Sequence, residues 1–188
     1  MKKIIISALL GVLLLNAPAH AQEAPAADIA PPIVVVVDIQ KILRDCNASK
    51  GVREQLATKR DGYQKEIVAG EKALHDEQQT LMKGRGDMTE AQFNEKRKAF
   101  EDKVKKMNEK VQSRARVLDA AMNDALGQIK QTAGQIVSDA AATRKANLVL
   151  DKGQVVVVES SLDLTKEVMD TLNAKMPKVD VKFTEPKA

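Results

Sequence analysis

The chain has 188 residues, enough for one domain, and 30% of them are charged while only 2% are aromatic. Without Trp, and with one Tyr and three Phe, it is a poor candidate for an ordinary globular core and a good one for long helices in water. The formal net charge is +4, and Lys2 and Lys3 contribute two of these charges, so most of the chain is only weakly basic.

Residues 1–21 have the pattern of a secretory signal peptide. A charged start is followed by an apolar run of 12 residues, Ile4 to Leu15, and by the small-x-small sequence Ala19-His20-Ala21. A membrane-spanning helix needs about 20 apolar residues, so the run is too short for an anchor. We therefore predict an exported protein that is cleaved after Ala21.

A short apolar strand is the first predicted element of the fold. Residues 22–32 are rich in Ala and Pro and are expected to form a flexible leader. Residues 33–37 are β-branched and apolar on both faces, which predicts a strand that is buried on both sides. Asp38 is placed to cap a short helix that follows.

The stretch 49–145 is predicted to be one antiparallel helical hairpin with a tip at residues 83–87. Apolar residues on the returning leg recur at steps of three, four or seven over almost seven heptads: Phe93, Phe100, Val104, Met107, Val111, Leu118, Met122, Ala125, Ile129, Ala133, Ile136 and Ala140. The outgoing leg repeats more sparsely, at Val52, Leu56, Tyr63, Ile67, Leu74 and Leu81. Lys59, Gly70 and Gln78 interrupt that seam, so we expect loose packing between the legs.

Positive charge is concentrated on the outer hairpin. Residues 50–116 contain 17 Lys/Arg and 12 Asp/Glu, a net charge of +5, and the remainder after the signal peptide is −3. Because acids alternate with the bases and aromatic residues for stacking are scarce, nucleic acid is a poor partner. Anionic lipid or lipopolysaccharide fits the charge better, and a protein client fits best.

After the hairpin, the sequence predicts two more strands and a helix. Residues 147–150 and 154–158 are predicted strands that are apolar after Asn147 and Gln154, and the turn between them has Gly153 where a positive φ is permitted. Asp163 is placed to cap an amphipathic helix with a stripe of Leu164, Val168, Met169 and Leu172, which Pro177 ends. Residues 178–188 are polar and are expected to form a flexible tail.

The predicted fold is thus α+β, with a coiled-coil-like arm at 49–145 on a small β body made of 33–48 and 146–177. Three short strands and one helix are too small to bury both faces of a sheet, so we expect the body to oligomerise. The apolar strand residues are the expected oligomerisation residues: Val34, Val35, Val36, Val37, Leu148, Leu150, Val155, Val156, Val157 and Val158.

No motif for catalysis, a metal or a cofactor is found in the sequence. Cys46 is the one cysteine, and a small apolar role suits it better than a redox role. His75 is the one histidine after the signal peptide, so a zinc set is lacking. Nucleotide-binding and nucleophile-elbow patterns are missing, and the carboxylates read as a solvated charged face. We therefore expect neither an enzyme nor a bound cofactor.

A surface for other proteins is predicted on the distal half of the hairpin. The candidate residues are apolar side chains and the bases beside them: Leu74, Leu81, Met82, Met88, Phe93, Lys96, Arg97, Lys98 and Phe100. The alternative is that the apolar ones only hold the two legs together. Gly127 and Gly134, near the root of the arm, serve either close helix approach or flexibility, and the sequence leaves both open.

Three stretches together resemble the Skp/OmpH family of periplasmic chaperones. They are Ile33-Val-Val-Val-Val-Asp-Ile-Gln-Lys-Ile-Leu43, Ala146-Asn-Leu-Val-Leu-Asp-Lys-Gly-Gln-Val-Val-Val-Val158 and Ser161-Leu-Asp-Leu-Thr-Lys-Glu-Val-Met-Asp-Thr-Leu172. The resemblance implies a periplasmic homotrimer whose strands join in a barrel and whose arms hold unfolded outer-membrane proteins without ATP. The rival interpretation is a periplasmic adaptor or spacer whose hairpin docks onto an envelope complex.

Overall fold

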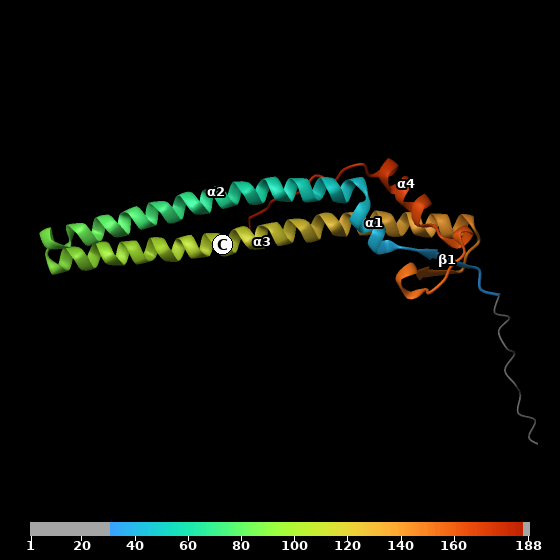
Figure 1. The fold of residues 1–188 in the computed structure, drawn as a ribbon, viewed down its shortest axis with the longest axis horizontal. Helices are drawn as coiled ribbons and strands as arrows, with labels where there is room; N and C mark the ends of the chain where they lie inside the picture. Colours follow the sequence, from blue (N-terminus) through green and yellow to red (C-terminus); the bar gives the residue numbers. More distant parts are fainter. Residues whose placement is uncertain (1–30, 186–188) are drawn as a thin grey trace, which may run out of the picture. The chain divides into compact units, whose positions relative to one another are not determined.

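The computed structural model describes residues 31–185, and the element order is strand, helices, strand, helix (Figure 1). The predicted signal peptide, its cleavage site after Ala21 and most of the leader lie outside the described residues. From Pro32 onward the chain forms a single compact unit by its internal contacts. This unit consists of a long helical hairpin and a small body at the root of the hairpin.

The hairpin is formed by α2, Asn47–Lys83, and α3, Glu90–Thr143, which run side by side (Figure 1). These helices have 37 and 54 residues, so at about 1.5 Å rise per residue they are roughly 55 and 80 Å long. The tip is the 3-10 turn η1, Gly84–Asp87, where the sequence placed it. Thr89 caps α3 by a capping box with Gln92, whose side chain accepts from the Thr89 N–H at 3.0 Å.

The body contains a two-stranded parallel sheet and two helices. Strand β1, Val34–Val37, pairs with β2, Leu148–Asp151, in the register Val34 to Leu148. Helix α1, Ile39–Asp45, begins at Asp38, whose side chain accepts from the Lys41 N–H as predicted. Helix α4, Thr165–Lys175, follows the short turns η2, Lys152–Gln154, and η3, Ser160–Leu162.

The predicted third strand at residues 154–158 does not form, which corrects the sequence analysis. The free edge of β1 is taken by the start of the α4 segment, because Leu164 N donates to Val36 O at 2.8 Å and Asp163 bridges Val36. The edge of β1 that faces away from β2 is therefore occupied, and residues 154–158 cannot pair with it. Gly153 does not use the positive φ that a glycine permits, since none of the described glycines has one.

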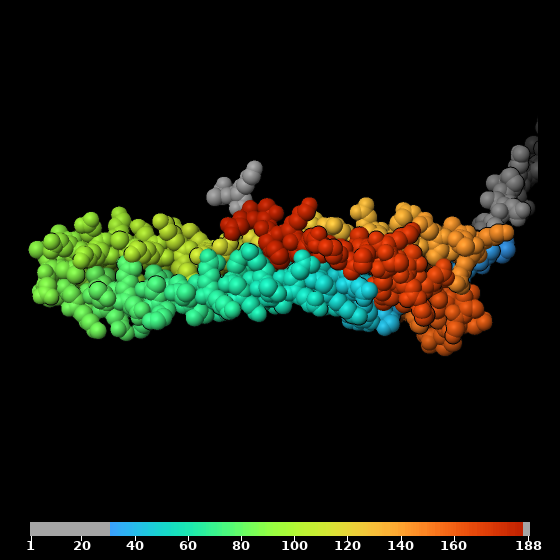
Figure 2. Space-filling model, turned by 90° about the horizontal axis from the view of Figure 1, so that it is seen from above, coloured from blue at the N-terminus to red at the C-terminus, as the bar shows by residue number. Residues whose placement is uncertain are grey.

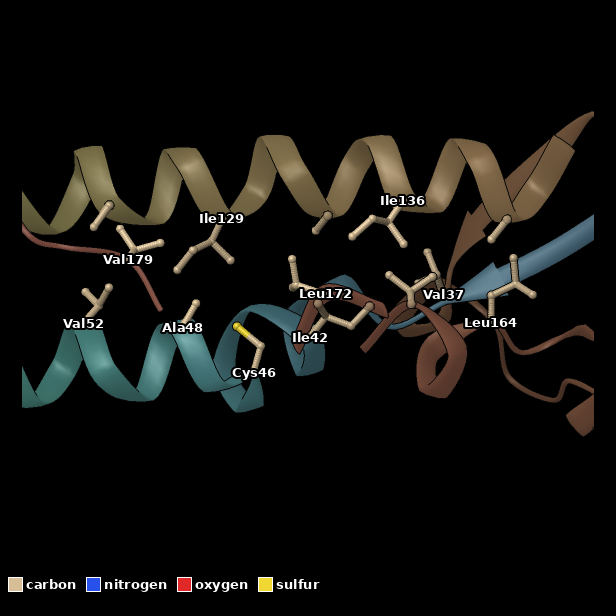
Figure 3. Close-up of a cluster of buried hydrophobic side chains, with 14 of the residues drawn as sticks. Val37, Ile42, Cys46, Ala48, Val52, Ile129, Ile136, Leu164, Leu172 and Val179 are labelled. Carbon is tan, nitrogen blue, oxygen red and sulfur yellow. The ribbon is translucent and has the colours of Figure 1, made fainter. Parts of the chain in front are cut away.

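The hydrophobic core lies where the body meets the root of the hairpin (Figure 3). Side chains from β1, α1, α2, α3 and α4 are buried together in it, including Ile42, Ile129, Leu164 and Leu172 at zero exposure. Cys46 belongs to this cluster and donates from Sγ to Ser49 Oγ at 3.1 Å. The apolar role that was preferred for this cysteine agrees with its burial.

Packing in the hairpin weakens steadily toward the tip. Tyr63 on α2 and Val117 on α3 are the last buried residues, and in the described stretch from 64 to 116 no side chain is fully buried. Gly70 is filled from the opposite helix, because a Cβ at this position would lie 2.9 Å from Met107 Cε. The outer arm is therefore held by half-buried contacts, as the sparse seam predicts.

Gly127 and Gly134 have open space where a Cβ would lie, so close helix approach does not explain them. We expect Gly127→Ala and Gly134→Ala each to raise the free energy of unfolding by about 0.5–1 kcal/mol, because Ala restricts the unfolded chain and favours helix. Urea unfolding followed by circular dichroism measures this. Gly70→Ala is the contrast, since Met107 must move; a loss of stability in all three variants would contradict the explanation.

Asp163 joins the sheet to α4 through two hydrogen bonds. Its Oδ1 accepts from the Thr165 N–H at 2.9 Å, and its Oδ2 lies 2.5 Å from Lys152 Nζ. Burial opposes its ionisation, but the bonds from Lys152 and Thr165 outweigh this and lower the pKa of the carboxyl. The N-cap residue of α4 is Leu164, which makes no side-chain cap hydrogen bond, so the prediction that Asp163 is the cap is wrong; Asp163 instead binds the N–H of the first helical residue, Thr165.

Asn keeps an oxygen for the Thr165 N–H but loses the charge that faces Lys152, so we expect Asp163→Asn to lower the free energy of unfolding by about 0.2–1 kcal/mol at pH 7. The folded-state pKa is depressed, so the contribution of ionised Asp163 is present above its unfolded pKa near 4 and is lost as pH falls through the folded value. Urea titrations at pH 7 and pH 3 should show the difference between variant and parent shrink at pH 3. Asp180→Asn, at an exposed site, is the control; an equal effect of both changes would count against this role.

Residues 178–185 are not a loose tail, which corrects the expectation for this part of 178–188. After α4 they run back along the hairpin, and Figure 2 shows this red segment lying on the surface of the two long helices. Val179 is only 6% exposed and lies between Val52 and Ile129 (Figure 3). We call residues 178–185 the C-terminal strap.

Candidate functional site

The predicted apolar client residues lie in the seam of the outer hairpin. Five of them are half-buried between α2 and α3: Leu74, Leu81, Met88, Phe93 and Phe100. Met82 is the exception, because it is 61% exposed and projects away from the seam. These residues therefore hold the helices together and still present part of their surface to solvent.

The seam can be reached from both sides of the hairpin. One groove of about 300 Å³ is lined by Gly70, Leu74, Met107 and the stems of Lys103, Lys106 and Lys110. Another of about 300 Å³ is lined by Leu74, Phe100, Val104, Met107 and Val111. Leu74 and Met107 border both grooves, so an apolar ligand segment can contact this part of the seam from either face.

Several basic residues on this stretch of α3 are paired with carboxylates. Arg97 lies 3.3 Å from Glu101, Lys103 2.6 Å from Glu77, and Lys105 4.0 Å from Glu109. Within residues 31–185, Lys96, Lys98 and Lys106 have no carboxylate at ion-pair distance, and their side chains are exposed. These three lysines therefore supply most of the uncompensated positive charge on this stretch of α3.

The tip carries a cation–π contact that the sequence analysis missed. The Arg85 guanidinium lies 4.2 Å from the centroid of the Phe93 ring. The two residues are eight positions apart and meet only because the chain turns at η1. In the sequence, an Arg within the predicted turn and a Phe shortly after it could have indicated this contact.

A second cluster, nearer the root, was also missed. Arg114 lies 4.5 Å above the Tyr63 ring, 3.2 Å from Glu66 and in contact with Glu185 of the C-terminal strap. The hydrogen bonds that Arg114 donates to Glu185 and Glu66 raise the pKa of Arg114, and the bonds that Lys110 and Arg114 donate lower the pKa of Glu66. The cluster fixes the end of the strap to both helices, and its members are too far apart in sequence to be read together.

The structure divides the predicted oligomerisation residues into two sets. Val35, Val36 and Val37 are buried inside the protomer, so they are not available to another copy, and Val34 is half-buried. Val156 and Val157 are 100% and 85% exposed, and Leu148 and Val149 are exposed on β2. We call these four residues the valine surface. Leu150, Val155 and Val158 are half-buried beside it.

No metal-binding cluster of three or more His, Cys, Asp or Glu side chains is formed between residues 31 and 185. None of the helices in this range combines the length and apolar character that crossing a bilayer requires.

A long helical hairpin rooted in a small parallel sheet defines a class of α+β proteins with a projecting helical arm. The model of the OmpH-like outer membrane protein family matches residues 33–172, and the chain belongs to this family. A solved structure from Caulobacter crescentus CB15, described as a candidate OmpH-like outer membrane chaperone, has the same fold at a TM-score of 0.76. The two share 19% identity over 85% of this chain and 94% of that one. No curated protein matches the chain.

Proposed function

We propose that the chain is an ATP-independent holdase chaperone of the periplasm that binds unfolded outer-membrane proteins. The observation that carries the proposal is the outer hairpin, where a seam without fully buried side chains is open on both faces and where Lys96, Lys98 and Lys106 are exposed on the same stretch of α3. Membership of the OmpH-like family and the description of the Caulobacter relative support a chaperone role. The signal-peptide pattern of residues 1–21 supports export.

The working form is proposed to be a homotrimer assembled through the valine surface. Val156 and Val157 are almost fully exposed and lie beside the outer strand β2. An apolar segment next to an unpaired strand edge favours pairing with another chain. Assembly by this surface would leave the hairpins free as arms around a shared space.

Binding is proposed to begin with charge and to continue with weak apolar contact. The +5 hairpin attracts acidic segments of a client over a Debye length of about 8 Å at physiological salt. Seam residues such as Leu74 and Met107 then cover apolar client side chains, and Met adapts to varied shapes. Because no nucleotide is used, release depends on client folding or transfer. Anionic lipid or lipopolysaccharide would compete for the same charge.

The proposal is tested with an unfolded β-barrel protein diluted from urea in the presence of the chain that starts at Gln22. Light scattering by the aggregating client should be suppressed when the chain is present in stoichiometric amounts. Suppression should not require added nucleotide. Undiminished aggregation at several-fold excess would reject the holdase function and favour the adaptor or spacer alternative.

If charge attracts the client, changing Lys96, Lys98 and Lys106 together to Gln should slow client association. We expect the association rate with an acidic unfolded client to fall roughly tenfold at low salt, and the deficit to disappear at high salt. Stopped-flow fluorescence measures the rate. The matched control changes Lys41, Lys166 and Lys175 in the body, which should leave the rate nearly unchanged; equal losses in both triple variants would refute a role for this face.

A further inference from the structure

The C-terminal strap has the side-chain pattern of a β-strand although it lies on helices. Val179, Val181 and Phe183 face the hairpin and are buried or half-buried, while Lys178, Asp180 and Lys182 are exposed. Such alternation at every second residue needs an extended backbone. The helices α2 and α3 therefore form a groove that accepts an extended, alternating segment (Figure 2).

Gln55 holds the backbone of the strap by two hydrogen bonds. Its Oε1 accepts from the Val181 N–H at 3.0 Å, and its Nε2 donates to the Val179 carbonyl at 2.8 Å. Both partners are main-chain groups, which every residue except Pro offers in the same geometry. Gln55 thus acts as a clamp for extended backbone of any sequence. The groove adds only the requirement that alternate side chains are apolar.

The groove continues beyond the part that the strap fills. Next to Phe183 is an open hollow of about 910 Å³, with Thr58, Lys59 and Tyr63 among its lining residues. Gly51 and Gly62 also line it, and a Cβ at either would meet nothing within 4 Å. Lys59 Nζ lies 4.9 Å from the Tyr63 ring and 5.5 Å from the Phe183 ring. Glu54, Glu66 and Arg114 line it as well, so the hollow has an aromatic wall with both signs of charge and room for further side chains.

We propose that this groove is a binding site for extended client segments with apolar side chains at every second position, and that the strap is its built-in competitor. Strands of outer-membrane barrels have this alternation, because lipid-facing and lumen-facing residues alternate along them. The inference rests on the proposed function and adds to it a site at the root of the arm. A released strap exposes the clamp of Gln55, and a returning strap displaces a weakly held segment.

Tethering gives the competitor its strength. Only two residues, Met176 and Pro177, separate the end of α4 from the strap, so its effective concentration at the groove is of millimolar order. A single weak segment is largely excluded while the strap is bound, since its apparent affinity is reduced by the fraction of open grooves. Removal of the strap should therefore raise the affinity of the groove for such a segment.

The test uses a fluorescent peptide of residues 177–185 and fluorescence anisotropy. It compares the chain that starts at Gln22 with the same chain ended at Pro177, and with a full-length Val181→Asp, Phe183→Ser variant that retains buried Val179. We expect the peptide to bind both altered chains at least about tenfold more tightly than the unaltered chain. A second peptide, in which Asp180 and Val181 exchange places, has the same composition without the alternation and should bind none of them.

Gln55→Ala provides the independent measurement. Introduced into the full-length double variant, it should weaken peptide binding roughly tenfold through the loss of two hydrogen bonds. The matched control is Gln135→Ala, on the exposed face of α3, which should leave binding unchanged. Equal binding of the peptide to all chains, or of both peptides to the altered chains, would overturn the proposal.

Aggregation assays on the same variants separate this inference from the proposed function. If the parent chain suppresses client aggregation but the peptide fails to bind either strap variant, the groove is not a client site and the holdase function stands. If peptide binding follows the expected order while aggregation is not suppressed, the groove recognises extended segments and the holdase function fails. Circular dichroism on each variant confirms that the helices are retained.

Discussion

Changing Val156 and Val157 together to Asp is expected to convert the assembled protein to monomers. These side chains are 100% and 85% exposed, and in a single chain they bury nothing. Two carboxylates placed in an apolar interface would each lose hydration without a partner, which costs several kcal/mol per ion. Analytical ultracentrifugation should show one protomer mass for the variant and a multiple of it for the parent.

The matched control is Val68→Asp, since Val68 is an exposed valine on the arm rather than on the valine surface. It should leave the mass of the assembly unchanged. Far-UV circular dichroism of the double variant should remain close to that of the parent, because α2 and α3 do not depend on residues 156 and 157. An assembly that survives the double change would mean that the copies meet through another surface.

The second large effect is expected at Ile129, which is buried where α3, α2 and the C-terminal strap meet (Figure 3). Ile129→Ala should lower the free energy of unfolding by about 2–5 kcal/mol, through lost burial and the cavity that remains. Val52 and Val179 line the same cluster from two different segments and limit how far the site can collapse. Urea unfolding at fixed protein concentration measures the loss.

Met122→Ala on the same helix is the comparison, because Met122 is among the exposed apolar residues of α3. Its effect should remain within about 0.5 kcal/mol, as is usual for surface positions. If the two substitutions destabilise the protein equally, the core is not where the structure places it.

The hairpin could be predicted from sequence because its signals are local. Apolar residues recur at the helical period along both legs, and glycines with Thr89 mark the tip, so tip and helix bounds agree with the structure to within a few residues. The loose seam was also predicted, since Lys59, Gly70 and Gln78 interrupt it. What periodicity did not show was the insertion of Met107 over Gly70.

The third strand was predicted wrongly because strand formation depends on a partner that composition does not reveal. Val155–Val158 have high β propensity, but Asp163 and Leu164 take the free edge of β1. The same limit applies to β1, whose valines are buried by helices of the same chain instead of by other copies. Propensity identified apolar segments correctly and did not identify what covers them.

The C-terminal strap was missed because its composition is polar. Charged residues at 178, 180 and 182 make this stretch look polar as a whole. The apolar residues Val179, Val181 and Phe183 nevertheless recur at every second position, and this period could have predicted an extended segment with one buried face. The partner Gln55 is more than 120 positions away and has no feature that distinguishes it in the sequence. Long-range contacts such as this one, or that of Arg114 with Glu66 at 48 positions, follow from how the chain folds back and not from any motif.

The most direct test of the central claim is the mass of the complex formed with an unfolded outer-membrane β-barrel protein. Sedimentation at physiological salt and without nucleotide should show one species containing three copies of the chain and one client. A monomeric chain that sediments separately from the client would contradict the account.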